Sequence, residues 1–209
     1  KGNLSITDTQ TTTLQYLGFN CRSGPFADTK LRRAISQGIN RDSICKAYFS
    51  GHAVSAQFPV APASSWYPLA SEEGYNAESF AQAMTEAGYN GGAHAASVRM
   101  LVCEGNAFRL SAAKAIAAAL SVYDLKVQVY TLPYEEYLSA LENGMFDLYY
   151  GETRMTADFN CSALIKTGGI LNYGGFSDPA LDAQLTTAFS TAASPSSANE
   201  TLFSTFQTD

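Results

Sequence analysis

The sequence predicts an α/β fold in which a mainly parallel sheet is flanked by helices. Three segments rich in β-branched and aromatic residues, at 98–103, 125–130 and 146–150, have the composition of strands. Helical segments at 106–120 and 133–144 separate them through short connections. Strands that alternate with helices in this way are joined by right-handed crossovers and therefore pair in parallel.

The first half of the chain is expected to add one strand and three helices. Residues 13–20 alternate apolar and polar side chains, which is typical of a strand. The expected helices begin at capping residues, namely Asp28 or Thr29 for the first, Asp42 for the second and Asn76 for the third. The segment from 53 to 75 contains three prolines and is predicted to be a long loop, because proline disrupts helices and central strands.

Two more helices are expected after the third core strand. The first begins at Ser177 or Asp178, with Pro179 in its first turn. The second lies near 202–206, after a linker of small residues. We expect all of 1–209 to form a single α/β lobe.

Composition and charge exclude two classes of protein. With 46% hydrophobic and 15% charged residues, the chain has the composition of a globular protein. No apolar run approaches the roughly 18 residues that a membrane-spanning helix needs, and the N-terminus does not resemble a signal peptide. The net charge of −6 and the scattered basic residues argue against nucleic-acid binding.

No motif for metal or catalytic chemistry is evident. The four cysteines, at 21, 45, 103 and 161, lack metal-type spacing, and whether they form disulfides stays open. His52 and His94 lie far apart, so we expect no metal site and no cofactor. The chain has no Gly-x-Ser-x-Gly elbow and no phosphate-binding glycine loop. We expect a protein that is not an enzyme, and a small α/β hydrolase is an alternative.

A series of short motifs then indicates a family. In chain order they are Tyr16-Leu17-Gly18-Phe19-Asn20, Pro25-Phe26-Ala27-Asp28, Arg32-Arg33-Ala34-Ile35, Ile39-Asn40-Arg41-Asp42-Ser43-Ile44, Phe49-Ser50-Gly51-His52-Ala53, Ala87-Gly88-Tyr89, Gly144-Met145-Phe146-Asp147-Leu148 and Phe176-Ser177-Asp178-Pro179-Ala180-Leu181-Asp182. Their order resembles the C-terminal lobe of family 5 extracellular solute-binding proteins, which serve oligopeptide, dipeptide and nickel ABC importers in bacteria. Asn40 stands where the family usually has Asp.

The resemblance implies a lobe of the periplasmic-binding-protein type, with 13–20 as the strand that crosses between two lobes. Family members are longer, so we expect this chain to be a fragment. The full protein is expected to be a monomer that captures a small solute, most often a short peptide, and delivers it to ABC permease subunits. It would lie in the periplasm or outside the cytoplasmic membrane, held by a lipid anchor that this chain lacks. A surface peptide-sensing receptor or adhesin of the same fold is the alternative.

Candidate ligand-binding residues follow the third core strand. In open α/β sheets, ligands bind beyond the carboxyl ends of the strands, which selects Glu152, Arg154, Asp158 and Asn160. The resemblance implies that an Asp after this strand pairs with the amino terminus of a peptide, and Asp158 fits that position best. A carboxylate suits the role because a desolvated ammonium group needs an anionic, hydrogen-bonded partner.

Arg154 and Asp158 each have a second interpretation, in which they do not bind the ligand. Peptide binders of the family usually place a Trp soon after this strand, whereas this chain has Glu152-Thr153-Arg154. Arg154 either binds a ligand carboxylate or pairs with Glu152 or Asp158, and Asp158 is alternatively a loop cap. Further ligand-binding candidates, which are polar or aromatic residues outside this segment, are Asn20, Trp66, Asn172 and Tyr173.

Overall fold

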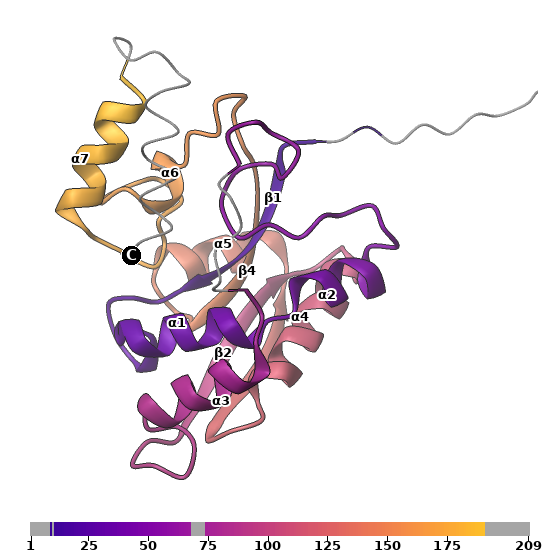
Figure 1. Ribbon diagram of the computed structural model, residues 1–209, viewed down its shortest axis with the longest axis vertical. Coiled ribbons are helices and arrows are strands. Elements are labelled where there is room, and N and C mark those ends of the chain that lie inside the picture. Colours follow the sequence, from indigo (N-terminus) through magenta and orange to yellow (C-terminus); the bar gives the residue numbers. More distant parts are fainter. Residues whose placement is uncertain (1–8, 10, 68–73, 191–209) are drawn as a thin grey trace, which may run out of the picture.

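The computed structural model describes residues 9, 11–67 and 74–190 (Figure 1). Its elements are β1 (Thr13–Phe19), η1 (Pro25–Ala27), α1 (Thr29–Gly38), α2 (Arg41–Tyr48), α3 (Ala77–Glu86), β2 (Ala96–Cys103), α4 (Ala107–Leu120), β3 (Leu125–Leu132), α5 (Tyr134–Glu142), β4 (Leu148–Arg154), α6 (Ser162–Ile165) and α7 (Pro179–Ala188). The helix predicted near 202–206 lies outside the described residues.

The strands form one sheet in the order β1-β4-β2-β3. β2 pairs in parallel with both β3 and β4, as the alternation of strands and helices predicts. β1 joins the edge of the sheet antiparallel to β4, in a register that runs from Thr13 opposite Arg154 to Phe19 opposite Leu148. The predicted α/β class with a mainly parallel sheet is therefore confirmed.

Helices cover both faces of this sheet. On one face, residues of α1, α3 and α4 pack against Met100 and Leu148, which are both fully buried. On the other face, α5 packs against Phe146 and Tyr149. Successive residues of β4 face opposite ways, so that Tyr150 returns to the first face. This alternation fixes the side of the sheet on which each polar residue beyond Tyr150 emerges.

A third apolar cluster lies beyond the end of the sheet. It joins Val60 of the proline-rich loop to Met155, Phe159 and Cys161, which follow β4, and to Leu185 of α7. In Figure 1, α6 and α7 lie together, apart from α1 to α4. This cluster thus brings segments from both halves of the chain next to the predicted ligand-binding loop.

The observed helix N-caps match the predicted ones at three positions and differ from the prediction at one. Asp28, Asn76 and Asp178 accept hydrogen bonds from backbone N–H groups in the first turns of α1, α3 and α7. The predicted cap of α2 at Asp42 is wrong. The side chain of Asn40 caps this helix by accepting from the backbone N of Ser43 at 2.9 Å, which places Asp42 inside the first turn.

The predicted limits of the last core strand, 146–150, are also wrong. β4 begins at Leu148 and continues to Arg154. Residues 151–154 are Gly-Glu-Thr-Arg, whose polar composition is not typical of a buried strand. They are extended because each one pairs with a residue of β1. Glu152 and Arg154 therefore lie on the strand itself rather than beyond it.

Two further features of the described residues concern membrane spanning and the cysteines. In the described part, no helix is long and apolar enough to cross a membrane. All four cysteines are free thiols. Cys161 is fully buried, whereas Cys21, Cys45 and Cys103 are half-buried.

We predict that Cys161 resists alkylation in the folded protein. Burial raises the pKa of its thiol from the ordinary 9.0 to about 12, so the reactive thiolate is scarce. Iodoacetamide at about pH 8 should modify the half-buried cysteines first and Cys161 only after urea unfolding, as peptide mass spectrometry would show. Because folding raises this pKa, the thiol's contribution to stability is complete below about pH 9 and is lost as the pH rises toward 12. Equal labelling of all four native cysteines would contradict the prediction.

Candidate functional site

The carboxyl edge of the parallel strands carries a chain of polar side chains that starts on β1. Gln15 lies opposite Glu152 in the β1–β4 register, and its Nε2 donates to Glu152 Oε2 at 2.9 Å. The Tyr150 hydroxyl donates to Gln15 Oε1 at 2.6 Å. Burial raises the pKa of Tyr150 to about 12, so this hydroxyl keeps its proton at neutral pH. The Glu152 carboxylate is thereby held in a fixed orientation at the end of the sheet.

Arg109 approaches the same carboxylate from α4. Its Nη1 lies 3.8 Å from Glu152 Oε1, a distance that brings the charges together without a short hydrogen bond. The two side chains are 24% and 31% exposed. Arg109 Nε is buried and has no hydrogen-bond partner within the described part of the chain. Arg109 is thus a half-buried cation with unfilled donors, at the amino-terminal turn of a helix whose dipole also favours an anion.

Arg109 and Gln15 are not among the ligand-binding candidates that the sequence indicates. Arg109 is one of two charged residues in an alanine-rich helix and comes close after the end of β2. Gln15 is one polar residue in an alternating strand. The position of Arg109 after a core strand was an available signal, since the first turn of such a helix lies at the ligand-binding edge. For Gln15 the decisive fact is its register against Glu152, which only the structure provides.

Asp158 lies in a tight turn after β4. The turn closes with a hydrogen bond from the backbone N of Phe159 to the carbonyl of Thr156 at 3.0 Å. Oδ1 of Asp158 accepts from the backbone N of Asn160 at 3.3 Å. Asn160 in turn accepts from the backbone N of Ser162, at the start of α6, at 2.9 Å. Asp158 is half-buried, and its other carboxylate oxygen accepts no hydrogen bond from the residues that the structure describes.

Arg154 does not form the internal ion pair that its neighbours suggest. Its side chain is exposed at the end of β4, and it has no salt bridge among the described residues. Glu152, the expected partner, is held by Gln15 and Arg109 instead. Arg154 is therefore a second cation at this edge that the rest of the described chain leaves available.

Trp66 reaches this region from the proline-rich loop. Its ring meets the ring of Phe159 edge to face, with centroids 6.2 Å apart and planes at 86°. The structure thus brings Trp66 to the turn of Asp158 and Asn160, although more than ninety positions separate them in the chain.

Two other predicted residues, Asn20 and Tyr173, lie at the opposite end of the sheet. Because β1 is antiparallel to β4, Asn20 lies where β4 begins, and its backbone N donates to the carbonyl of Asp147 at 2.9 Å. The ring of Tyr173 contacts Tyr149 with centroids 6.0 Å apart. The Tyr173 carbonyl accepts a hydrogen bond from Nη1 of Arg22 at 3.2 Å, and Arg22 lies two positions after Asn20 in the chain. The structure therefore does not bring this group together with Asp158.

Asn20 and Asn172 use their amide groups inside the protein. Nδ2 of Asn20 donates to the carbonyl of Phe146 at 3.0 Å, and its Oδ1 accepts from the backbone N of Arg22 at 3.1 Å. Asn172 donates to the carbonyls of Lys166 and Phe176 at 3.0 and 2.7 Å. It also accepts from the backbone N of Phe176 at 3.0 Å. Both side chains are buried, which leaves little capacity for a ligand.

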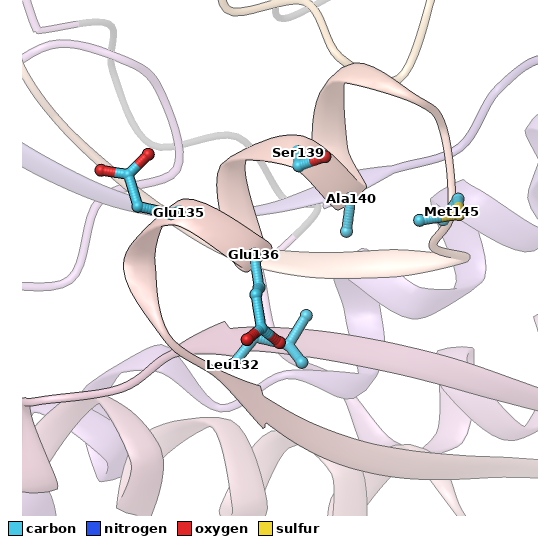
Figure 2. Close-up of a pocket in the computed structure, with 6 residues that line it drawn as sticks. All are labelled: Leu132, Glu135, Glu136, Ser139, Ala140 and Met145. Atoms are coloured by element: carbon cyan, nitrogen blue, oxygen red, sulfur yellow. The ribbon is translucent and has the colours of Figure 1, made fainter.

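A separate hollow of about 450 Å³ lies beside α5 (Figure 2). It is lined by Leu132, Glu135, Glu136, Ser139, Ala140 and Met145. In Figure 2 the carboxylate of Glu136 lies over Leu132, while that of Glu135 points away. None of the predicted ligand-binding residues lines this hollow. The described residues also contain no cluster of side chains suited to hold a metal ion.

Comparisons with known proteins agree with this architecture. The chain matches the family model described as bacterial extracellular solute-binding proteins, family 5 middle, over residues 1–160. It is 31% identical to heme-binding protein A of Haemophilus influenzae over 78 residues, which make up 37% of this chain and 14% of that protein. The chain therefore matches a small part of the length of this curated relative.

Solved structures show the same fold. The oligopeptide-binding protein AppA of Bacillus subtilis, in complex with a nonapeptide, is similar with a TM-score of 0.82 and 20% identity. NikA of Staphylococcus aureus, in complex with Ni(L-His)2, is similar with a TM-score of 0.82 and 13% identity. Each likeness covers 94% of this chain and 43% of the solved one. At these identities the likeness concerns the fold, and the two ligands named are chemically different.

Proposed function

Because the chain belongs to family 5 of the bacterial extracellular solute-binding proteins, we propose that it forms one wall of the ligand site in the binding component of an ABC importer. The proposed ligand is a short peptide, captured between this lobe and a second lobe of the full-length protein. β1 would be the strand that connects the two lobes. Permease subunits of the importer would receive the ligand, outside the cytoplasmic membrane.

The observation that carries this proposal is the pair of opposite, incompletely satisfied charges at one edge of the sheet. Asp158 offers a carboxylate oxygen on a half-buried residue, and Arg109 offers a buried guanidinium donor, Nε, that has no partner among the described residues. A peptide has an ammonium group at one end and a carboxylate at the other, so it complements both. Charge-assisted hydrogen bonds of this kind are stronger than those between neutral groups.

Arg109 is the better of the two cations for a ligand carboxylate. Its guanidinium is partly desolvated and is aligned by Glu152, which limits the entropy lost on binding. Arg154 is exposed at the end of β4 and is proposed to contribute at the rim. Glu152 is proposed to orient Arg109 rather than to contact the ligand.

The direct test is to identify what the full-length protein carries. The protein would be purified natively without detergent or denaturant, and bound small molecules would be identified by native mass spectrometry. Recovery of short peptides of mixed sequence is the expected result. A single non-peptide solute, such as a haem or a metal chelate, would show that the peptide assignment is wrong while leaving the family unchanged.

We predict that Asp158→Asn weakens the binding of peptides with a free amino terminus by at least about tenfold, because the ammonium group loses its charged partner. Isothermal titration calorimetry would compare a tripeptide pool with the same pool acetylated at the amino terminus. Acetylated peptides carry no ammonium group, so their affinity should change little. Asp124→Asn, at an exposed aspartate before β3, is the control that should leave both affinities unchanged. Equal affinity of wild type and Asp158→Asn for the free pool would refute the ammonium contact.

A further inference from the structure

The turn that carries Asp158 contains a residue in an unusual backbone conformation. Phe159 has a φ of 53°, in the left-handed region that glycine adopts freely and bulky side chains avoid. This conformation costs free energy and persists only where the surrounding structure holds it in place. The contacts of the Phe159 side chain therefore matter for the shape of the turn.

Those contacts come from the apolar cluster beyond the end of the sheet. Phe159 is 7% exposed and packs in this cluster with Met155, Cys161 and Leu185. Trp66 closes over it edge to face, with ring centroids 6.2 Å apart. Such aromatic pairs contribute stability beyond the area that they bury. Burial of one ring against another thus offsets the strain at Phe159.

The hydrogen bonds of the turn depend on the same conformation. The backbone N of Asn160 donates to Thr156 Oγ1 at 3.1 Å and lies 3.3 Å from Asp158 Oδ1. The backbone N of Phe159 donates to the carbonyl of Thr156. Rotation about the N–Cα bond of Phe159 would move the amide of Asn160 away from both acceptors. It would also turn the Asp158 carboxylate relative to α6.

We infer that Trp66 and Phe159 are positioning residues, which hold the Asp158 carboxylate in the orientation that receives a ligand ammonium group. The inference rests on the ammonium contact of Asp158 in the proposed function. Trp66 thus acts through Phe159 and not by direct contact with the ligand, although the sequence makes it a candidate for such a contact. A loop from the first third of the chain thereby sets the geometry of a carboxylate that follows the last core strand.

The test compares affinities of the full-length protein for free and acetylated tripeptide pools by isothermal titration calorimetry. Trp66→Leu removes the edge-to-face contact and is expected to lower the free-to-acetylated affinity ratio about tenfold. Trp66→Phe keeps an aromatic ring and should retain most of that ratio. Phe189→Leu is the matched control, because Phe189 packs against the same cluster and has no ring contact with Phe159 among those described. It should leave the ratio unchanged.

A double mutant separates positioning from a general structural effect. If Trp66 acts through Asp158, then Trp66→Leu should not lower the ratio further in an Asp158→Asn protein. An equal loss of affinity for both pools in Trp66→Leu would overturn the inference. A further fall in the free-to-acetylated ratio when Trp66→Leu is added to Asp158→Asn would also overturn it. Either result would leave the proposed function intact. If Asp158→Asn itself leaves the ratio unchanged, the proposed ammonium contact is wrong. Hydrogen exchange then decides whether Trp66 holds the turn. Faster exchange at the amides of Phe159 and Asn160 in Trp66→Leu would support this positioning role, and unchanged exchange would overturn it.

Discussion

Replacing Gly18 by alanine is expected to destabilise the protein by about 2–3 kcal/mol, which is the upper part of the range for overpacked cores. Gly18 lies opposite Tyr149 in the β1–β4 register, and a Cβ atom at Gly18 would lie 2.1 Å from Cε1 of that ring. The Tyr149 ring is 4% exposed and packs edge to face against Tyr16 and Phe146, so it has no room to retreat. Urea unfolding followed by far-UV circular dichroism would measure the change.

The same arrangement occurs a second time on this pair of strands. Gly151 lies opposite Tyr16, and a Cβ there would lie 2.5 Å from Cζ of the Tyr16 ring. Each strand therefore supplies one glycine and one tyrosine, and each ring covers the glycine of the other strand. We expect this interlock to fix the register of β1 against β4, because a shift by one residue would drive both rings into side chains.

A double mutant tests the cause of the predicted loss at Gly18. In a Tyr149→Ala protein the added methyl group meets no ring, so the further cost of Gly18→Ala should fall to about 0.5 kcal/mol or less. A Gly-to-Ala change without a clash should even be slightly stabilising, since it restricts the unfolded chain. An unchanged or raised free energy of unfolding for Gly18→Ala alone would contradict the interlock.

The register also explains which parts of the fold were predictable. The strands β2 and β3, the helix between them and the caps at Asp28 and Asp178 follow from patterns that a few neighbouring residues carry. The end of β4 does not follow from such a local pattern. Residues 151–154 are extended because they pair with β1, which lies more than one hundred positions away in the sequence. Local composition cannot report a pairing partner at that distance.

The candidate site likewise combines residues whose positions the sequence predicts with residues that only the structure brings together. The position of Asp158 was predictable because it follows a core strand, and its role as a ligand contact stays a prediction based on the rule that ligand sites lie beyond the carboxyl ends of such strands. Arg109 and Gln15 reach Glu152 from two other elements, so their meeting depends on the packing of α4 and the register of β1. Asn20 was a further ligand-binding candidate in the sequence, but β1 runs antiparallel to β4 and places Asn20 at the opposite end of the sheet.

Asn172 is the sequence candidate whose replacement should cost most in stability. Asn172→Ala is expected to lower the free energy of unfolding by about 3 kcal/mol, at about 1 kcal/mol for each of three hydrogen bonds lost. Those bonds close the loop between Lys166 and Phe176. Their loss removes the described partners of the carbonyl and the N–H of Phe176, whereas the Lys166 carbonyl still accepts from the backbone N of Gly169 at 2.8 Å. Urea unfolding would measure the effect. Asn143→Ala is the control, since that exposed side chain bonds to the end of α5 and should cost about 0.5 kcal/mol or less.

The same variant distinguishes a structural asparagine from a ligand contact. If Asn172 only closes its loop, Asn172→Ala should leave the affinity for the tripeptide pools unchanged under conditions where the variant is folded. A residue that contacts the ligand would show the reverse, a loss of affinity with little loss of stability. The buried amide, with its oxygen and nitrogen both bonded to the backbone of its own loop, favours the first result. The ligand contacts would then be confined to the carboxyl edge of the sheet, where Asp158 and Arg109 lie.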